Sequence, residues 1–208
     1  MGPSSAPYFS EFVEGRRGEI LDAALAVFQE KGYAGGTMRD IATRLGLTEP
    51  ALYRHYAGKE ALYCDMLAVA GDHVIENAAA RMAGIQPENL RESLLTLIAR
   101  GPRHGSNGGG MMGTLMASAP HNEALMATFR DRIAQPMLAG FREFVPRVDG
   151  FFGITRTPAE LDSAVRVFLS LFVGYVATSK VLALPDDDEV IVDGMIRVMG
   201  WNGDRHHA

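Results

Sequence analysis

The 208-residue sequence has few of the features that mark extracellular, metal-binding or membrane proteins. It contains one cysteine, Cys64, so no internal disulfide can form and a structural zinc site would lack its usual ligands. No charge-free apolar run reaches the ~18 residues that cross a bilayer, and the N-terminus lacks the basic and apolar blocks of a secretory signal. We therefore expect a cytoplasmic protein with no metal, no cofactor and no membrane partner.

Motifs of common enzyme classes are also missing. The chain has no Gly-x-Ser-x-Gly nucleophile motif, no His-Glu-x-x-His zinc motif and no paired metal ligands. The glycine-rich stretch 101–110 is not a nucleotide cradle, because no strand pattern precedes it and no Gly-Lys-Ser/Thr follows it. We therefore do not expect an enzyme.

Apolar residues instead recur with the 3.6-residue period of helices from end to end, without a strand-like alternation or an internal repeat. The sequence thus predicts an all-α fold. Residues 1–15 lack the periodicity and contain several Pro and Gly residues, so we expect a flexible N-terminal arm. Residues 16–60 are predicted to form a small three-helix domain, and residues 61–208 a larger helical domain.

The small domain has the signals of a helix-turn-helix. Thr37 and Asp40 fit the N-cap and third position of a helix that Gly46 ends. A new helix follows almost at once, with Pro50 in its first turn, where no intrahelical N–H is needed. Two short helices joined by so tight a turn must cross steeply, which is helix-turn-helix geometry.

The local charge also suits a nucleic-acid partner, although the whole chain carries a net charge of −5. Between residues 35 and 59 the chain has four basic and two acidic side chains, so 4 − 2 gives +2. Phosphate binding depends on the charges at the contact and not on the total. This segment is therefore compatible with a DNA-binding surface.

Two segments carry a resemblance to a known family. Residues 37–62, TMRDIATRLGLTEPALYRHYAGKEAL, closely resemble the DNA-binding domain of the TetR/AcrR family of regulators, and residues 20–33, ILDAALAVFQEKGY, look like its first helix. The order of the later helices is similar to the family's ligand-binding and dimerisation domain. The resemblance implies a ligand-responsive transcriptional regulator, a repressor that binds a palindromic operator as a homodimer and is released by a small apolar or aromatic molecule.

A recognition helix places its N-terminal half in the major groove, while inward side chains such as Leu52 and Tyr56 anchor it. By resemblance, Thr48, Glu49 and Ala51 match base-facing positions of the family. The positions of Thr37, Tyr53, His55 and Lys59 match phosphate-contacting ones. The candidate DNA-binding residues are Thr37, Arg39, Thr48, Glu49, Ala51, Tyr53, Arg54, His55 and Lys59.

The larger domain concentrates methionine and aromatic residues in its central helices, where methionine can line an adaptable cavity. Core packing explains each of them singly, but the set beside the glycine-rich stretch predicts a ligand site. The candidates are Met111, Met112, Met116, Met126, Phe129, Met137 and Phe141. A small-molecule-binding helical enzyme or carrier, in which DNA binding is secondary, remains the alternative function.

Residues 167–179 contain no charged side chain, and their apolar residues point in nearly every direction around the predicted helix. A helix that is apolar all round must be covered on every side, and the core of its own domain covers only one. We predict a two-fold dimer in which this helix and the helix 188–199 meet their copies in a four-helix bundle. The candidate interface residues are Phe168, Ser170, Phe172, Gly174, Ala177, Ile191, Met195 and Val198.

Overall fold

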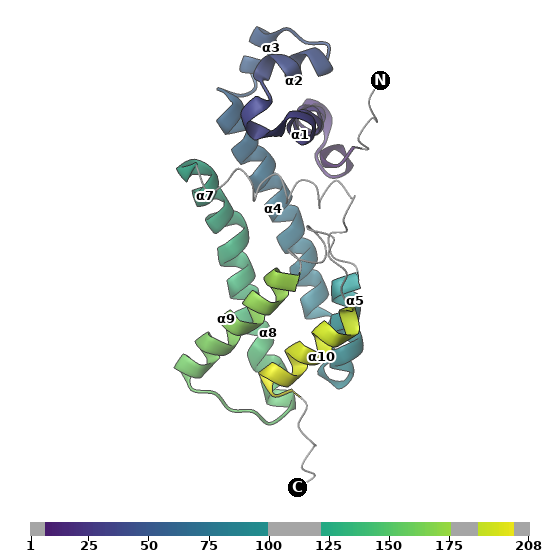
Figure 1. Cartoon of the computed structure of the whole chain (residues 1–208), viewed down its shortest axis with the longest axis vertical. Helices are drawn as coiled ribbons and strands as arrows, with labels where there is room; N and C mark the ends of the chain where they lie inside the picture. Colours follow the sequence, from purple (N-terminus) through teal and green to yellow (C-terminus); the bar gives the residue numbers. More distant parts are fainter. Residues whose placement is uncertain (1–6, 100–121, 176–186, 202–208) are drawn as a thin grey trace. The chain divides into compact units, whose positions relative to one another are not determined.

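The computed structural model describes residues 7–99, 122–175 and 187–201, and every regular element in these ranges is a helix (Figure 1). This agrees with the predicted all-α class. The described residues fall into two compact units, one with residues 7–73 and 122–133, the other with residues 74–99, 134–175 and 187–201. The division falls inside helix α4 (Lys59–Ala83), whereas the expected domain boundary was at residue 60. No helix in the described ranges is long and apolar enough to cross a membrane.

The first unit is built from α1 (Gly15–Gly35), α2 (Met38–Arg44), α3 (Glu49–Tyr53) and the first part of α4. Its core consists of fully buried side chains from all four helices, among them Ile20, Phe28, Ile41, Leu52 and Leu62. The helical geometry of α1 is interrupted at Gly32, where φ is +69°. Glycine adopts this conformation without steric cost, so Gly32 allows α1 to break at this point.

Part of the segment expected to be a flexible arm is packed onto this unit. A short 3-10 helix, η1 (Phe9–Glu11), buries Phe9 completely. The carboxylate of Asp22 on α1 accepts the backbone N–H groups of Tyr8, Phe9 and Ser10 at 2.8, 2.7 and 3.1 Å. The ring of Phe12 stacks on His73 of α4, with 3.9 Å between ring centroids. Residues 8–12 are therefore a structured strap across α1 and α4.

A second run of helix contributes to both units. It begins with α7 (Glu123–Phe129), passes through a π-helical turn, η4 (Arg130–Ala134), and continues as α8 (Gln135–Phe151). The π-helical turn lies directly before Pro136, which stands in the first turn of α8. Proline has no N–H to donate, so one bond of the regular i→i−4 ladder is missing at this point. The irregularity therefore lies next to a residue that cannot donate to the helical ladder.

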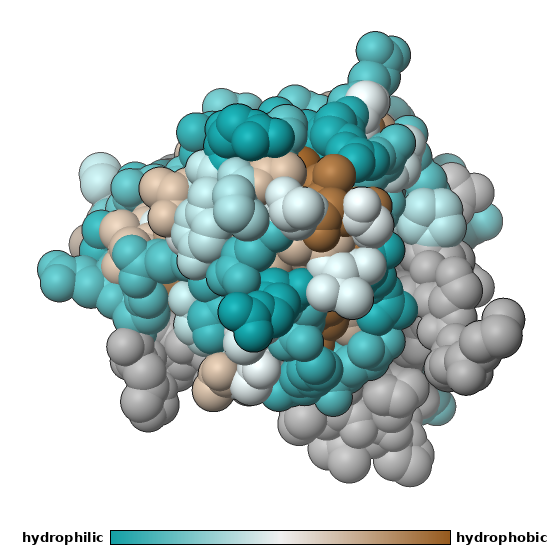
Figure 2. Space-filling model, turned by 90° about the horizontal axis from the view of Figure 1, so that it is seen from above, coloured by the Kyte–Doolittle hydropathy of each residue, from teal (hydrophilic) through white to brown (hydrophobic). Residues whose placement is uncertain are grey.

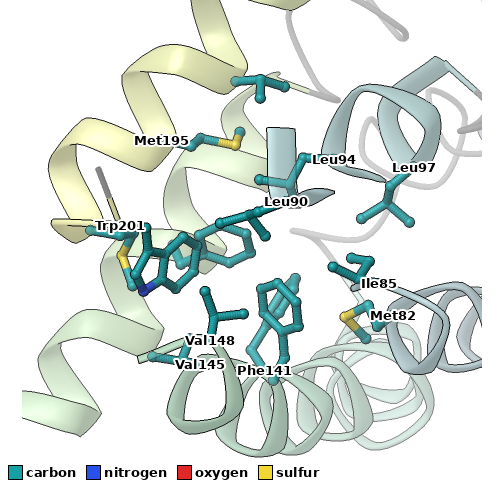
Figure 3. Close-up of a cluster of buried hydrophobic side chains, with 14 of the residues drawn as sticks. Met82, Ile85, Leu90, Leu94, Leu97, Phe141, Val145, Val148, Met195 and Trp201 are labelled. Atoms are coloured by element: carbon teal, nitrogen blue, oxygen red, sulfur yellow. The ribbon is translucent and has the colours of Figure 1, made fainter. Parts of the chain in front are cut away.

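The second unit packs α5 (Leu90–Ala99), preceded by η2 (Pro87–Asn89), with α8, α9 (Pro158–Tyr175) and α10 (Asp188–Met199) around one apolar core. Figure 3 shows side chains from these helices and from the end of α4 converging on it. The ring of Phe168 meets the rings of Phe141 and Trp201 at centroid distances of 5.1 and 5.3 Å.

One buried charge joins the C-terminal parts of this unit. Asp149 on α8 is only 3% exposed and accepts two hydrogen bonds from the guanidinium of Arg156, at 2.8 and 2.9 Å. It also accepts the indole N–H of Trp201 at 2.8 Å. Arg156 donates in addition to the carbonyl of Met199 at the end of α10, at 2.7 Å. The cluster therefore fixes the end of α10 against α8.

Candidate nucleic-acid interface

The start of α2 carries the capping box that the sequence predicted. The Thr37 hydroxyl oxygen accepts the N–H of Asp40 at 3.1 Å, and the Asp40 carboxylate accepts the backbone N–H and the hydroxyl of Thr37 at 3.1 and 2.8 Å. Lys31 donates to the same carboxylate at 2.6 Å. Hydrogen bonds from Lys31 and Thr37 lower the pKa of Asp40 to about 2. Both donors of Thr37, a candidate phosphate contact, are thus already bound to Asp40.

The turn between α2 and α3 is as tight as the sequence indicated. Gly46 has φ of +66°, and the N–H of Leu47 donates back to the carbonyl of Ala42 at 2.8 Å. Helix α3 then begins with Pro50 in its first turn and directs Leu52 into the core, where it is fully buried. Because left-handed φ is costly for other residues, Gly46 is the point that allows the chain to reverse here. The result is a helix-turn-helix.

The segment after α3 is held by a network of three side chains. The hydroxyl of Tyr56 donates to Asp65 of α4 at 2.7 Å, and Arg17 of α1 donates to both oxygens of Asp65, at 3.0 and 2.6 Å. Partial burial and the hydrogen bond to Asp65 raise the pKa of Tyr56. Partial burial works to raise the pKa of Asp65, but its bonds to Arg17 and Tyr56 outweigh this and lower it. Tyr56 is therefore an anchor for α3, as the sequence indicated.

Several candidate DNA contacts lie free on the surface of this unit. Thr48, Tyr53, Arg54 and His55 are exposed, and their side chains form no hydrogen bond with any residue that the structure describes. Ala51 is half-buried beside them. Figure 2 views the molecule from above, on the side where α2 and α3 are drawn in Figure 1, and this face is mostly hydrophilic. These side chains are available to a ligand that approaches α3.

Two further candidates are paired with each other. The Nε of Arg39 on α2 lies 3.2 Å from Oε2 of Glu49 at the start of α3. The side chain of Arg39 is 82% exposed, whereas that of Glu49 is 33% exposed. The pair therefore leaves the arginine in solvent and holds the carboxylate against α2.

Lys59 is not free to serve a phosphate in this structure. Its ammonium donates to the backbone carbonyls of Tyr33, Ala34 and Gly36 at 2.7, 3.4 and 3.1 Å. It also lies 4.5 Å from the centroid of the Tyr33 ring. An ammonium has three N–H donors, and here all three point at the C-terminal end of α1. Sequence reasoning missed this role, because the carbonyls lie more than 20 positions earlier in the chain.

The candidate ligand-binding residues are dispersed. Met111, Met112 and Met116 lie outside the described residues. Met126 and Phe129 belong to the first unit, where Met126 is 42% exposed, and Met137 and Phe141 belong to the second. Phe141 is fully packed in the core against Phe168, so core packing accounts for it. Surface hollows in the described part of each unit are lined by residues other than these candidates.

The candidate dimer residues divide into buried and exposed ones. Phe168 and Met195 are buried in the core of their own unit and are unavailable to a partner, which corrects the prediction for these two. Phe172 and Ile191 are partly buried, Ser170, Gly174 and Val198 are exposed, and Ala177 lies outside the described residues.

Besides Val198, which the sequence prediction included, α9 and α10 expose apolar residues that were not among the candidates. Val167 is 42% exposed, Leu171 is 36% exposed and Val190 is 65% exposed. Val167 and Val198 line the same surface hollow. The i, i+4 spacing of Val167 and Leu171 places them on one face of α9 and was a usable signal.

Comparison with known proteins finds a family match within the first unit. Residues 20–66 match the family model described as bacterial regulatory proteins, tetR family. The helix-turn-helix of this chain therefore matches that of the TetR family. Among curated TetR-type relatives, the repressor KstR2 of Mycobacterium tuberculosis is 44% identical over 55 residues, which are 26% of this chain and 28% of KstR2. The repressor AcnR of Corynebacterium diphtheriae is 38% identical over 90 residues, 43% of each chain.

These matches span less than half the length of either curated relative. The likeness in fold extends much further along the chain. The crystal structure of the multidrug binding protein EbrR, complexed with malachite green, matches with a TM-score of 0.67. It covers 89% of this chain and 98% of EbrR at 21% identity, so the fold of the larger helical part is also that of EbrR.

Proposed function

We propose that this TetR-family chain is a ligand-responsive transcriptional repressor, which binds a palindromic operator as a homodimer and releases it when a small apolar or aromatic molecule binds. The observation that carries the proposal is the anchored α2–α3 pair. Leu52 and Tyr56 hold α3 from the inside, while Thr48, Tyr53, Arg54 and His55 stay exposed and unpaired among the described residues. A recognition helix in a major groove needs this division between inner and outer side chains.

The names of the relatives support a regulatory role. KstR2 and AcnR are named as transcriptional repressors, and the family model that matches this chain covers α2 and α3. EbrR was solved with malachite green, an aromatic dye, and shares the fold of the larger helical part. These similarities favour a regulator over the alternative of a helical enzyme or carrier.

The exposed apolar residues of α9 and α10 support the homodimer. Val167, Leu171 and Val198 present apolar surface to solvent on the two helices expected in the bundle. One helix-turn-helix reads few base pairs, so a second copy about one helical turn, ~34 Å, away is needed for a useful affinity. A two-fold dimer supplies this second copy and makes the operator palindromic.

The decisive experiment measures DNA binding and its response to ligand. Duplexes bound by the purified protein would be selected from a random pool, and the selected operator would be titrated in the presence and absence of malachite green and related aromatic cations. We expect a palindromic operator, binding that weakens steeply with salt, and weaker binding with a ligand that also raises the melting temperature. A reporter gene behind the operator should be silenced by the protein.

Two variants test the dimer separately. Leu171→Glu should place a charge in the two-fold contact and give monomers by light scattering, with much weaker operator binding. Ala139→Glu adds the same charge at another exposed position, on α8, and should stay dimeric. A wild-type protein that is monomeric at micromolar concentration, or that selects no duplex at all, would contradict the proposal.

A further inference from the structure

Glu49 adds a negative charge to a surface that is proposed to meet DNA. Double-stranded DNA carries about one negative charge per ~1.7 Å of its axis, so a free carboxylate at the start of a recognition helix would weaken binding to every sequence. The structure shows that this carboxylate is not free. Arg39 of α2 donates to its Oε2 at 3.2 Å and offsets its charge.

The hydrogen bond between Arg39 and Glu49 leaves one carboxylate oxygen and two guanidinium nitrogens without a hydrogen bond to any described residue. The only bond that Glu49 receives from a described residue is to Oε2, so Oε1 retains its capacity to accept. The bond from Arg39 uses Nε, so its two terminal nitrogens face solvent without a partner among the described residues. Glu49 does not act as a cap of α3, since the cap residue Thr48 and the first turn show no side-chain capping bond. An exposed ion pair by itself adds little stability.

We propose that Glu49 reads a cytosine in each half of the operator, accepting a hydrogen bond from the cytosine N4 amino group at Oε1, and that Arg39 is the positioning residue which orients and neutralises the carboxylate. This inference rests on the proposed DNA-binding function and adds the identity of one base. It also assigns to Arg39 a role through Glu49, where the sequence indicated only a general DNA contact.

The choice of cytosine follows from the groups that bases present in the major groove. Cytosine offers a donor, its N4 amino group, whereas guanine offers two acceptors and thymine an acceptor and a methyl group. Adenine offers a donor beside the N7 acceptor, which would face the carboxylate unfavourably and suits an amide side chain better. A paired carboxylate with one accepting oxygen therefore discriminates in favour of cytosine.

The test is a selection of half-sites from a fully randomised duplex pool, followed by affinity measurements on the four single-base variants of the selected site. The wild-type protein should select cytosine at one position in each half, by about tenfold over the other bases. Glu49→Gln should move the preference at that position to adenine, because glutamine both donates and accepts. Glu49→Ala should remove the preference there and retain the rest of the site.

The role of Arg39 is tested through base preference, which the loss of a merely structural residue would not change. Arg39→Met leaves the carboxylate unneutralised, so affinity should fall for all sequences and the preference for cytosine should weaken. The double variant Arg39→Met with Glu49→Gln should regain affinity, since no unpaired charge remains. Glu30→Gln is the matched control: Glu30 pairs with Arg44 at 2.8 Å in the same unit, and its loss should leave base selection unchanged.

The outcomes separate this inference from the function on which it rests. If the wild type selects a site without cytosine at the position that Glu49→Gln alters, or if Glu49→Gln keeps the wild-type preference, the assignment is wrong while DNA binding stands. If Arg39→Met binds and discriminates like the wild type, the positioning role is wrong. If no duplex is enriched by any of the proteins, the proposed function itself has failed.

Discussion

Replacing Lys59 by methionine should destabilise the first unit and leave the electrostatics of DNA binding largely intact. Methionine keeps most of the length and apolar stem of lysine but removes the ammonium. Three backbone carbonyls at the end of α1 would lose their donor, two of them at 2.7 and 3.1 Å and one at a longer 3.4 Å. The contact with the ring of Tyr33 would be lost as well.

The expected size follows from these contacts. A hydrogen bond from a charged donor contributes about 1.5–3 kcal/mol net, and a partly exposed cation–π contact about 0.5–1 kcal/mol. The site is half-buried, so water can replace part of what is removed, and contributions at one ammonium do not add fully. We expect a loss of about 2–3 kcal/mol, which lowers the melting temperature of a chain of this size by roughly 5–10 °C.

The assay pairs this variant with Arg54→Met. Arg54 is exposed and has no hydrogen bond among the described residues, so its loss should leave the melting temperature unchanged and reduce the salt dependence of operator binding by about one unit of slope. Lys59→Met should show the reverse, a lower melting temperature and an unchanged salt slope. A Lys59→Met protein that melts like the wild type but has a shallower salt slope would refute the structural role of Lys59. It would indicate instead that Lys59 contacts a DNA phosphate.

Two further predictions concern stability. Asp149→Ala should lower the free energy of unfolding in urea by about 3 kcal/mol, because it leaves Arg156 and the indole N–H of Trp201 without their buried acceptor; a change below 1 kcal/mol would contradict this. The pKa of Asp40 is lowered from 3.8 to about 2, so its contribution to stability is complete above about pH 4 and is lost as the pH falls towards 2. Asp40→Asn should therefore be less stable than the wild type at pH 6 and lose less of its stability between pH 5 and 2, as measured by thermal unfolding.

The helix-turn-helix could be predicted from the sequence because its signals are local. Thr37 caps Asp40 three residues on, Gly46 closes α2, and Pro50 stands in the first turn of α3. Each signal concerns backbone groups within a few positions, so spacing alone identifies it. The irregularity before Pro136 also has a local cause, because proline has no N–H to donate.

The features that sequence reasoning missed depend on partners that are distant along the chain. The strap at residues 8–12 is ordered by Asp22, more than ten residues later, and by His73. Lys59 reaches carbonyls 23 to 26 residues earlier. Nothing in the local spacing of either segment indicates these contacts, because they exist only once α1 and α4 are packed together.

The prediction for α9 was correct about the kind of surface and partly wrong about its residues. A charge-free apolar helix needs cover on more than one side, and α9 does bury Val165 and Phe168 while it exposes Val167 and Leu171. The periodicity of a helix fixes the angle between these two sets of side chains. It does not determine which of the two sets is buried in the core. That choice depends on the packing of α8 and α10 against α9, which brings Phe168 against Phe141 and Trp201.

The exposed face of α9 and the Arg39–Glu49 pair bear on the same quantity, the selectivity of the regulator for its operator. If one Glu49 favours cytosine by about tenfold, two copies on a palindrome favour the symmetric site by about a hundredfold, because contributions from well-separated positions multiply. A monomer reads one half-site only, so its preference for cytosine stays at about tenfold. Leu171→Glu should therefore lower selectivity as well as affinity, reducing the ratio between the intact operator and one altered at both cytosines from about a hundredfold to about tenfold. A variant that is monomeric but keeps the full ratio would show that the two half-sites are not read by two copies of α3.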